Sequence, residues 1–177
     1  MLCKSVVMAL SLAAAGCATS ESSAACPTSI DRVQLQLDYE AFDAAGWRAL
    51  LGRGCIDSAL ALLSAYRVTN VTRLTAEQTR EIDFHMGQSL AFGGRDGESV
   101  AHFERARGVG ASEEWSAYVE ATLAFLLGDV AVLAAQRERY ANAQGADPMR
   151  LSIIDGFIAC PNRPYREAVH CGVSTTH

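Results

Sequence analysis

Apolar side chains recur three and four residues apart along most of this chain, which is the spacing that gathers them on one face of an α-helix. The clearest run lies between residues 55 and 66, where the apolar positions are Ile56, Ala59, Leu60, Leu63 and Tyr66. The alternation of β-branched and polar residues that is typical of strands is nearly absent. The hydrophobic pattern therefore predicts an all-α fold.

Glycines and turn residues divide this pattern into about seven helices. We expect helices at about 30–51 (with one break), 55–66, 75–93, 97–107, 112–127, 129–140 and 147–158, and a last short turn that begins at Pro164. Thr75 followed by Gln78 is a capping-box sequence, which marks the beginning of the third helix. The segment 112–127 is apolar on nearly every face, so we expect it to be the central and most buried helix.

The segment 84–106, which reads FHMGQSLAFGGRDGESVAHFERA, resembles a tetratricopeptide repeat. Such a repeat is a pair of helices with small residues where the two helices pack together. Gly87 stands at the small position of the first helix, Ser99 stands at that of the second, and Gly94 stands at the turn. The resemblance implies that residues 84–106 form a helical hairpin.

The spacing of glycines extends this resemblance beyond one hairpin. Gly128 follows Gly94 by 34 residues, which is the period of the family. The resemblance implies about three degenerate repeats over residues 40–143, arranged as a short array of antiparallel hairpins. The alternative is an irregular bundle of helical hairpins without a repeat register.

The resemblance also implies a binding groove, because such arrays line their concave side with exposed positions of the first helix of each repeat. In this register the lining residues are Arg48, Phe84, Gln88, Trp115, Tyr118, Thr122 and Phe125. Aromatic and arginine side chains dominate the energetics of many interfaces, so an extended peptide or a partner helix would fit there. The alternative is that the aromatic residues are core and that the C-terminal helix, with Ile154 and Phe157, fills the groove.

The beginning of the chain resembles a bacterial lipoprotein signal peptide that ends in a lipobox. Lys4 precedes the apolar run 6–12, and Ala14-Ala15-Gly16 leads to Cys17. Positive charge, a short apolar stretch and small residues at a cleavage site are what an export signal needs. The run is too short to span a bilayer as a helix.

This resemblance implies a domain organisation and a cellular location. Residues 1–16 would be removed, and Cys17 would carry the lipid that anchors the protein in the membrane. Residues 17–29 would then be a tether, 30–159 the helical domain and 160–177 a C-terminal segment closed by a disulfide. Ala18 resembles the signal for sorting to the outer membrane. The alternative is cleavage by an ordinary signal peptidase, which would leave a soluble periplasmic protein.

Four cysteines follow Cys17, and an even number in an exported protein predicts two disulfides. Three pairings are open, and we favour Cys26–Cys55 and Cys160–Cys171. The first would join the start of the mature chain to the start of a helix, and the second would close the terminal loop. A zinc site that includes Cys171 is the alternative, which the absence of a Cys-x-x-Cys pair makes less favourable.

Charge excludes some partners. The chain has 15 basic and 20 acidic residues, and the loss of Lys4 with the signal would change the net charge from −5 to −6. Every other basic residue is an arginine, and no basic run exists. The sequence therefore offers no electrostatic footprint for nucleic acid or for anionic lipid headgroups.

The sequence contains little catalytic chemistry. His85 and His102 lie on neighbouring predicted helices, with Asp83 or Glu104 as candidate acids. No nucleophile elbow, His-Glu-x-x-His motif or phosphate-binding loop accompanies them. We therefore expect a protein without catalysis, metal or cofactor that acts as an interaction or assembly module for an envelope protein or peptide. The alternatives are a toxin-neutralising or small-ligand-binding periplasmic protein and, less favoured, an enzyme that uses this histidine pair.

Overall fold

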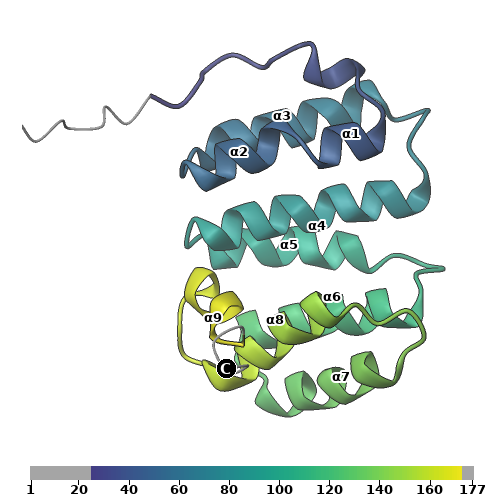
Figure 1. Ribbon diagram of the computed structural model, residues 1–177, viewed down its shortest axis with the longest axis vertical. Coiled ribbons are helices and arrows are strands. Elements are labelled where there is room, and N and C mark those ends of the chain that lie inside the picture. Colours follow the sequence, from purple (N-terminus) through teal and green to yellow (C-terminus); the bar gives the residue numbers. More distant parts are fainter. Residues whose placement is uncertain (1–24, 173–177) are drawn as a thin grey trace, which may run out of the picture.

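The computed structural model describes residues 25–172, and the regular secondary structure in this range is all helical. A short 3₁₀-helix comes first and nine α-helices follow (Figure 1). Their bounds are Gln34–Gln36 (3₁₀-helix), Tyr39–Asp43 (α1), Gly46–Gly52 (α2), Ile56–Thr69 (α3), Ala76–Phe92 (α4), Asp96–Arg107 (α5), Glu113–Leu127 (α6), Val130–Asn142 (α7), Pro148–Ala159 (α8) and Tyr165–Cys171 (α9). The prediction of an all-α fold is confirmed.

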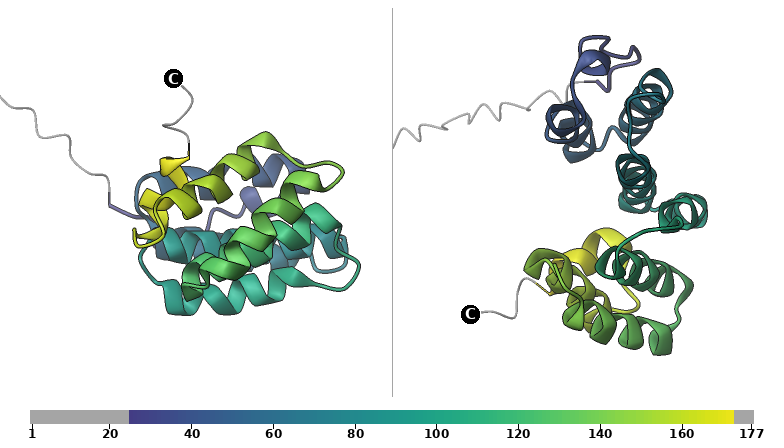
Figure 2. Two further views of the ribbon diagram at one scale, coloured as in Figure 1. Left: turned by 90° about the horizontal axis from the view of Figure 1, so that it is seen from below. Right: turned by 90° about the vertical axis from the view of Figure 1, so that its right-hand side faces the viewer.

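Successive helices pack as hairpins, which pair α2 with α3, α4 with α5, α6 with α7 and α8 with α9. The first three hairpins are stacked in chain order from top to bottom of Figure 1. In the right-hand view of Figure 2 the stack bends into an arc, and α2 and the α8–α9 hairpin project on the same side. The predicted array of helical hairpins is confirmed, and its last hairpin turns back against α6.

Local sequence signals set the ends of several helices. The Thr75 hydroxyl accepts a hydrogen bond from the Gln78 backbone N–H (3.1 Å), and the Gln78 side chain accepts one from the Thr75 N–H (3.0 Å). This is the predicted capping box at the start of α4. Gly94 and Gly128 lie in the turns after α4 and α6 with φ of 72° and 71°, a left-handed conformation that is open to glycine.

Two apolar clusters hold the hairpins together. The N-terminal cluster comprises Phe42, Trp47, Leu62, Leu63, Tyr66, Ile82 and Met86. The C-terminal cluster is built around α6, which buries nine of its fifteen residues. A helix that is apolar on nearly every face needs neighbours on nearly every face, and α6 has α5, α7 and α8 against it.

The start of the domain differs from the prediction. We expected a helix from about residue 30, but Ile30 and Val33 are exposed and the first α-helix begins at Tyr39. Although these two residues have helical spacing, neither of them is buried. The segment before α1 instead lies against the α2–α3 hairpin, where the Ser58 hydroxyl donates a hydrogen bond to the Pro27 carbonyl oxygen (2.7 Å).

The favoured disulfide pairing is confirmed. Cys26 is joined to Cys55, with 5.4 Å between the Cα atoms, and Cys160 is joined to Cys171, with 6.3 Å between them. The first bond attaches the segment before the 3₁₀-helix to the start of α3. The second joins the end of α8 to the end of α9, and the short turn predicted after Pro164 is the seven-residue helix α9.

The predicted signal peptide and Cys17 lie outside the described residues. Within residues 25–172, none of the helices has both the length and the apolar character needed to cross a bilayer. The two disulfides fit an oxidising compartment such as the periplasm or the extracellular space.

Candidate functional site

The inner side of the arc, where the sequence predicts a binding groove, is mostly filled. Five of the seven predicted groove residues are buried, namely Phe84, Trp115, Tyr118, Thr122 and Phe125. The prediction that these five line an exposed groove is wrong. Their side chains belong to the C-terminal core cluster and to its surroundings.

The C-terminal hairpin covers these residues. Phe157 of α8 stacks on Phe125, with ring centroids 4.5 Å apart. The guanidinium carbon of Arg150, also on α8, lies 5.3 Å from the Trp115 ring centroid and 5.4 Å from that of Tyr118. Helix α8 therefore occupies the surface of α6 that a partner helix would take.

A depression of about 500 Å³ stays open farther along the inner side, between α2, α4 and α9. It is lined by Trp47, Arg48, Leu51, Gly52, Gln88, Phe92, Arg166 and His170. We call it the concave depression. It contains the other two predicted groove residues, Arg48 and Gln88.

Aromatic and aliphatic side chains give the concave depression an apolar part. The Trp47 ring is almost fully buried between α2 and α4, where its centroid is 4.7 Å from that of His85. Leu51 follows one helical turn later on α2, and Phe92 lies at the end of α4. The Phe92 ring meets the Tyr165 ring edge to face at 5.4 Å, which fixes α9 beside α4.

The Asp43 carboxylate links α2 to α4 at the N-terminal edge of the depression. Asp43 accepts hydrogen bonds from the Arg48 guanidinium (2.6 Å) and lies 3.0 Å from His85 Nε2. Burial of Asp43 opposes its ionisation, but the hydrogen bond and charge of His85, together with those of Arg48, outweigh burial and lower the pKa of Asp43 to about 2. The Arg48 charge is therefore compensated within the protein.

The same polar chain continues across α4 to α9. His85 Nδ1 lies 3.0 Å from the Gln88 side-chain oxygen, and Gln88 Nε2 donates to the Tyr165 hydroxyl at 3.5 Å. Both ring nitrogens of His85 thus face oxygen atoms that accept hydrogen bonds, one on Gln88 and one on Asp43. Both ring nitrogens are therefore engaged by side chains of the protein itself.

The predicted histidine pair is not brought together. His85 contacts Asp43 and Gln88, whereas His102 on α5 contacts Arg105 (2.7 Å) and lies 3.8 Å from Asp83. The other candidate acid, Glu104, pairs with Arg107. These histidines serve two separate ionic clusters.

Asp83 is the centre of the second cluster, on the opposite side of α4. Its side chain is 3% exposed and lies 3.2 Å from Arg67 of α3 and 3.2 Å from Arg105 of α5. Burial opposes ionisation of Asp83, but His102 and the two guanidinium groups outweigh burial and keep its pKa below the ordinary value. The cluster joins three helices around one carboxylate.

The charges that line the concave depression are all basic or potentially basic. Arg48, Arg166 and His170 contribute them, and the lining includes no aspartate or glutamate. Arg166 makes no ion pair within residues 25–172 and is exposed on α9. A protein that is acidic as a whole therefore presents a free guanidinium group at this place.

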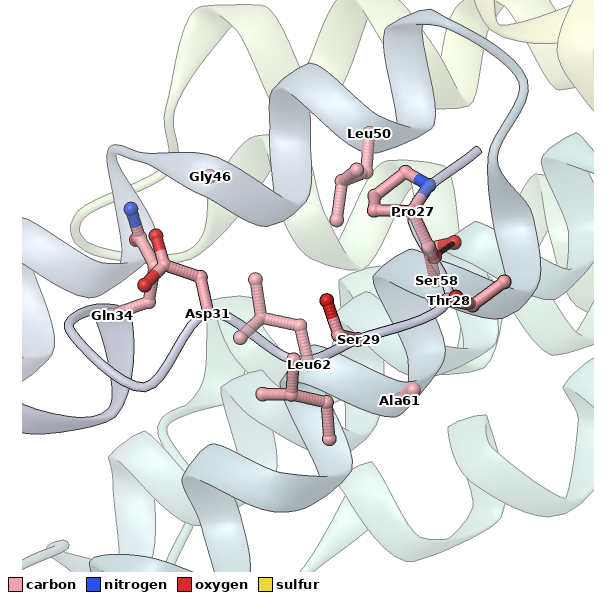
Figure 3. A pocket seen from close by; sticks show the side chains of 11 residues that line it. Pro27, Thr28, Ser29, Asp31, Gln34, Gly46, Leu50, Ser58, Ala61 and Leu62 are labelled. Atoms are coloured by element: carbon pink, nitrogen blue, oxygen red, sulfur yellow. Dashed lines mark hydrogen bonds between the residues drawn. The ribbon is translucent and has the colours of Figure 1, made fainter. Parts of the chain in front are cut away.

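A second, smaller pocket lies outside the arc, between the N-terminal segment and the α2–α3 hairpin. Its volume is about 180 Å³. In Figure 3 the segment with Pro27 and Ser29 crosses over Leu62 of α3, and Leu50 of α2 stands on the other side. Asp31 is the only charged residue that lines it, so it offers fewer groups for recognition than the concave depression.

The sequence reasoning missed the part of the site that α9 supplies. Arg166 and His170 are four residues apart and so share a face of a helix, which is a signal that the sequence contains. The placement of that face in the same depression as Gln88 depends on the return of the C-terminal hairpin over α6, which no local pattern encodes. The partnership of Asp43 with His85 likewise joins residues 42 positions apart.

No family model, no curated protein and no solved structure matches this chain. Within residues 25–172, no group of three or more histidine, cysteine, aspartate or glutamate side chains is placed to hold a metal ion. The function must therefore be argued from the geometry and the charges of this chain.

Proposed function

We propose that this protein is a non-catalytic interaction module of the bacterial cell envelope, which binds an envelope protein or peptide in the concave depression. The observation that supports this most is the depression itself, because aromatic, aliphatic and arginine side chains from three helices converge there. Aromatic and arginine side chains are enriched among the few residues that supply most of the binding energy in protein interfaces. A volume of about 500 Å³ is large enough for a few residues of a partner.

We further propose that the module is tethered to the outer membrane by a lipid on Cys17. The lipobox-like sequence that ends in Cys17 supports a lipid anchor, and Ala18 supports sorting to the outer membrane. The two disulfides agree with export. The mature chain would be acidic and free of lysine, so the lipid would be its only hold on the membrane.

The hairpins at the centre of the array support a degenerate tetratricopeptide-like architecture. A Cβ atom on Gly87 would lie 3.0 Å from the Phe103 ring, so the first helix needs a small residue there. Ser99 on the second helix is fully buried. In the proposed architecture these are the positions at which the two helices of a repeat approach each other.

Photocrosslinking in living cells tests the binding role. A benzophenone amino acid replaces Leu51 in the concave depression or, as the control, the exposed Val68 on α3. We expect position 51 to capture a specific envelope protein and position 68 not to capture it. Identical products from both positions, or none from either, would refute the proposal.

A small-ligand-binding or toxin-neutralising protein is the second candidate. The filling of the inner side by α8 favours it, because a groove closed by its own helix leaves a depression within the size range of ligand pockets. The same experiment separates the two. A small molecule that copurifies with the protein, in place of a crosslinked envelope protein at position 51, would support the second candidate.

A further inference from the structure

We infer that the concave depression is selective for an acidic peptide segment, with a carboxylate bound by Arg166 and a neighbouring apolar side chain placed against Leu51 and Phe92. This inference rests on the proposed function and adds the chemistry of the partner. It follows from three features of the depression, which are its free charge, its apolar part and its small size.

The free charge is that of Arg166. Arg48 also lines the depression, but its guanidinium is held by the Asp43 carboxylate at 2.6 Å, and its Nε donates to the Asp43 carbonyl oxygen. Arg166 has no such partner within the described range, and His170 stands one turn away on the same face of α9. A guanidinium binds a carboxylate through two parallel hydrogen bonds, so an aspartate or glutamate is the complementary group.

The apolar part adds a second requirement. Leu51 and Phe92, which are partly exposed, come from the two helices that face α9 across the depression, and the buried Trp47 lies beneath them. A ligand whose carboxylate reaches Arg166 therefore brings its next groups over these side chains. A peptide in which an acidic residue adjoins a leucine, methionine or aromatic residue would bury apolar surface and pair its carboxylate with Arg166 in the same complex.

The overall charge argues for a short peptide rather than a polyanion. Nucleic acids and anionic membranes need several basic groups, whereas the depression offers one arginine without a partner. The remainder of the mature chain, with a net charge near −6, repels a large anion. A single carboxylate on a flexible segment reaches Arg166 without that repulsion.

A randomised heptapeptide library tests the inference on the exported protein with both disulfides formed. The bound peptides are identified for the wild type, for Arg166→Glu and for Arg53→Glu. Arg53 is the matched control because it is exposed on the same protein, makes no ion pair in residues 25–172 and lies outside the depression. The wild type and Arg53→Glu should enrich peptides in which aspartate or glutamate adjoins an apolar residue.

The Arg166→Glu variant should bind those peptides at least about tenfold more weakly, since a charge-assisted hydrogen bond contributes about that much. It should also gain a preference for lysine or arginine at the same peptide position, which a misfolded variant would not do. Enriched peptides without acidic residues, or equal binding by Arg166→Glu, would overturn the inference.

The two proposals fail in different ways. A specific crosslink from position 51 combined with a library that shows no acidic preference would leave the interaction module in place and reject the acidic partner. The absence of both a crosslink and any enriched peptide would reject the proposed function together with the inference.

Discussion

At the scale of single residues, Asp83 is the only charged side chain that is buried within residues 25–172. It accepts a hydrogen bond from Arg105 and pairs with Arg67, so it joins α3 and α5 to α4. The two arginines are 37% and 45% exposed and stay solvated without it. The carboxylate thus depends on the arginines more than they depend on it.

Replacing Asp83 by asparagine should lower the free energy of unfolding by about 1–3 kcal/mol at pH 7, because charge-assisted hydrogen bonds to a buried acceptor are lost. Urea denaturation measures the change. Asp31→Asn is the control, because Asp31 is exposed and, within residues 25–172, accepts only from the nearby Val33 N–H. A loss as large for Asp31→Asn as for Asp83→Asn would contradict the role given to the cluster.

The pH dependence has a definite sign. The pKa of Asp83 is lower in the folded protein than in the unfolded chain, so the folded state binds its proton less readily. Its contribution to stability is complete above the unfolded value, which is about 4, and is lost as the pH falls through the lower folded value. The difference between wild type and Asp83→Asn should therefore shrink when denaturation is repeated at about pH 3.

At the scale of elements, α8 and α9 are held not only by side chains but also by a close approach of their backbones. A Cβ atom on Gly156 would clash with the carbonyl oxygen of Ala168, and one on Gly172 would clash with that of Ser152. The two helices therefore cross closely at these glycines. This crossing also fixes where α9 presents Arg166 to the concave depression.

Replacing Gly156 by alanine should destabilise the protein by about 1–3 kcal/mol, because backbone must move to admit the methyl group. Gly97→Ala is the matched control, since Gly97 is also helical and has open space around its Cβ position. That variant should keep or gain stability, by up to about 1 kcal/mol. Thermal unfolding of both variants measures this, and equal melting temperatures would show that the α8–α9 crossing is looser than described.

The elements that the sequence predicts well are those governed by neighbours in the chain. The capping box at Thr75 needs only Gln78, and the Gly94 turn needs only its own backbone freedom. The favoured disulfide pairing is correct as well, although the sequence by itself left three pairings open. The prediction of a helix from about residue 30 was wrong because it relied on the helical spacing of Ile30 and Val33. Such spacing places apolar residues on one face but does not show that another element covers that face.

The candidate site is less predictable, because its parts meet only after the last hairpin returns over α6. Aromatic residues such as Phe125 and Trp115 are typical of interfaces and of cores alike. Here Phe157 covers Phe125 and Arg150 covers Trp115, so both belong to the core. Arg48 and Gln88 were predicted at the groove and do line the concave depression. The contribution of Arg166 depends on the placement of α9, which is a property of the whole fold.

At the scale of the whole molecule, the lipid anchor can be tested directly. Metabolic labelling with palmitate should label the wild type and leave Cys17→Ser without label, because only Cys17 would carry acyl chains. Cys3→Ser is the control, since Cys3 would leave with the signal peptide and its loss should not change labelling. Absence of label from all three proteins would reject the anchor and favour the soluble periplasmic alternative.

If Cys17 carries the proposed lipid, the disulfide between Cys26 and Cys55 would limit how far the domain can travel from the bilayer. A fully extended chain covers at most about 3.6 Å per residue, so a lipid on Cys17 would keep Cys26 within about 32 Å of its attachment. Without the bond and without the packing of the segment before α1 on α3, the first α-helix at Tyr39 could move out to about 79 Å on the same estimate. Because Cys26 is joined to the start of α3, this shorter radius would apply to the folded domain itself. Oxidation in the envelope would thereby decide which layer of the periplasm the concave depression can reach.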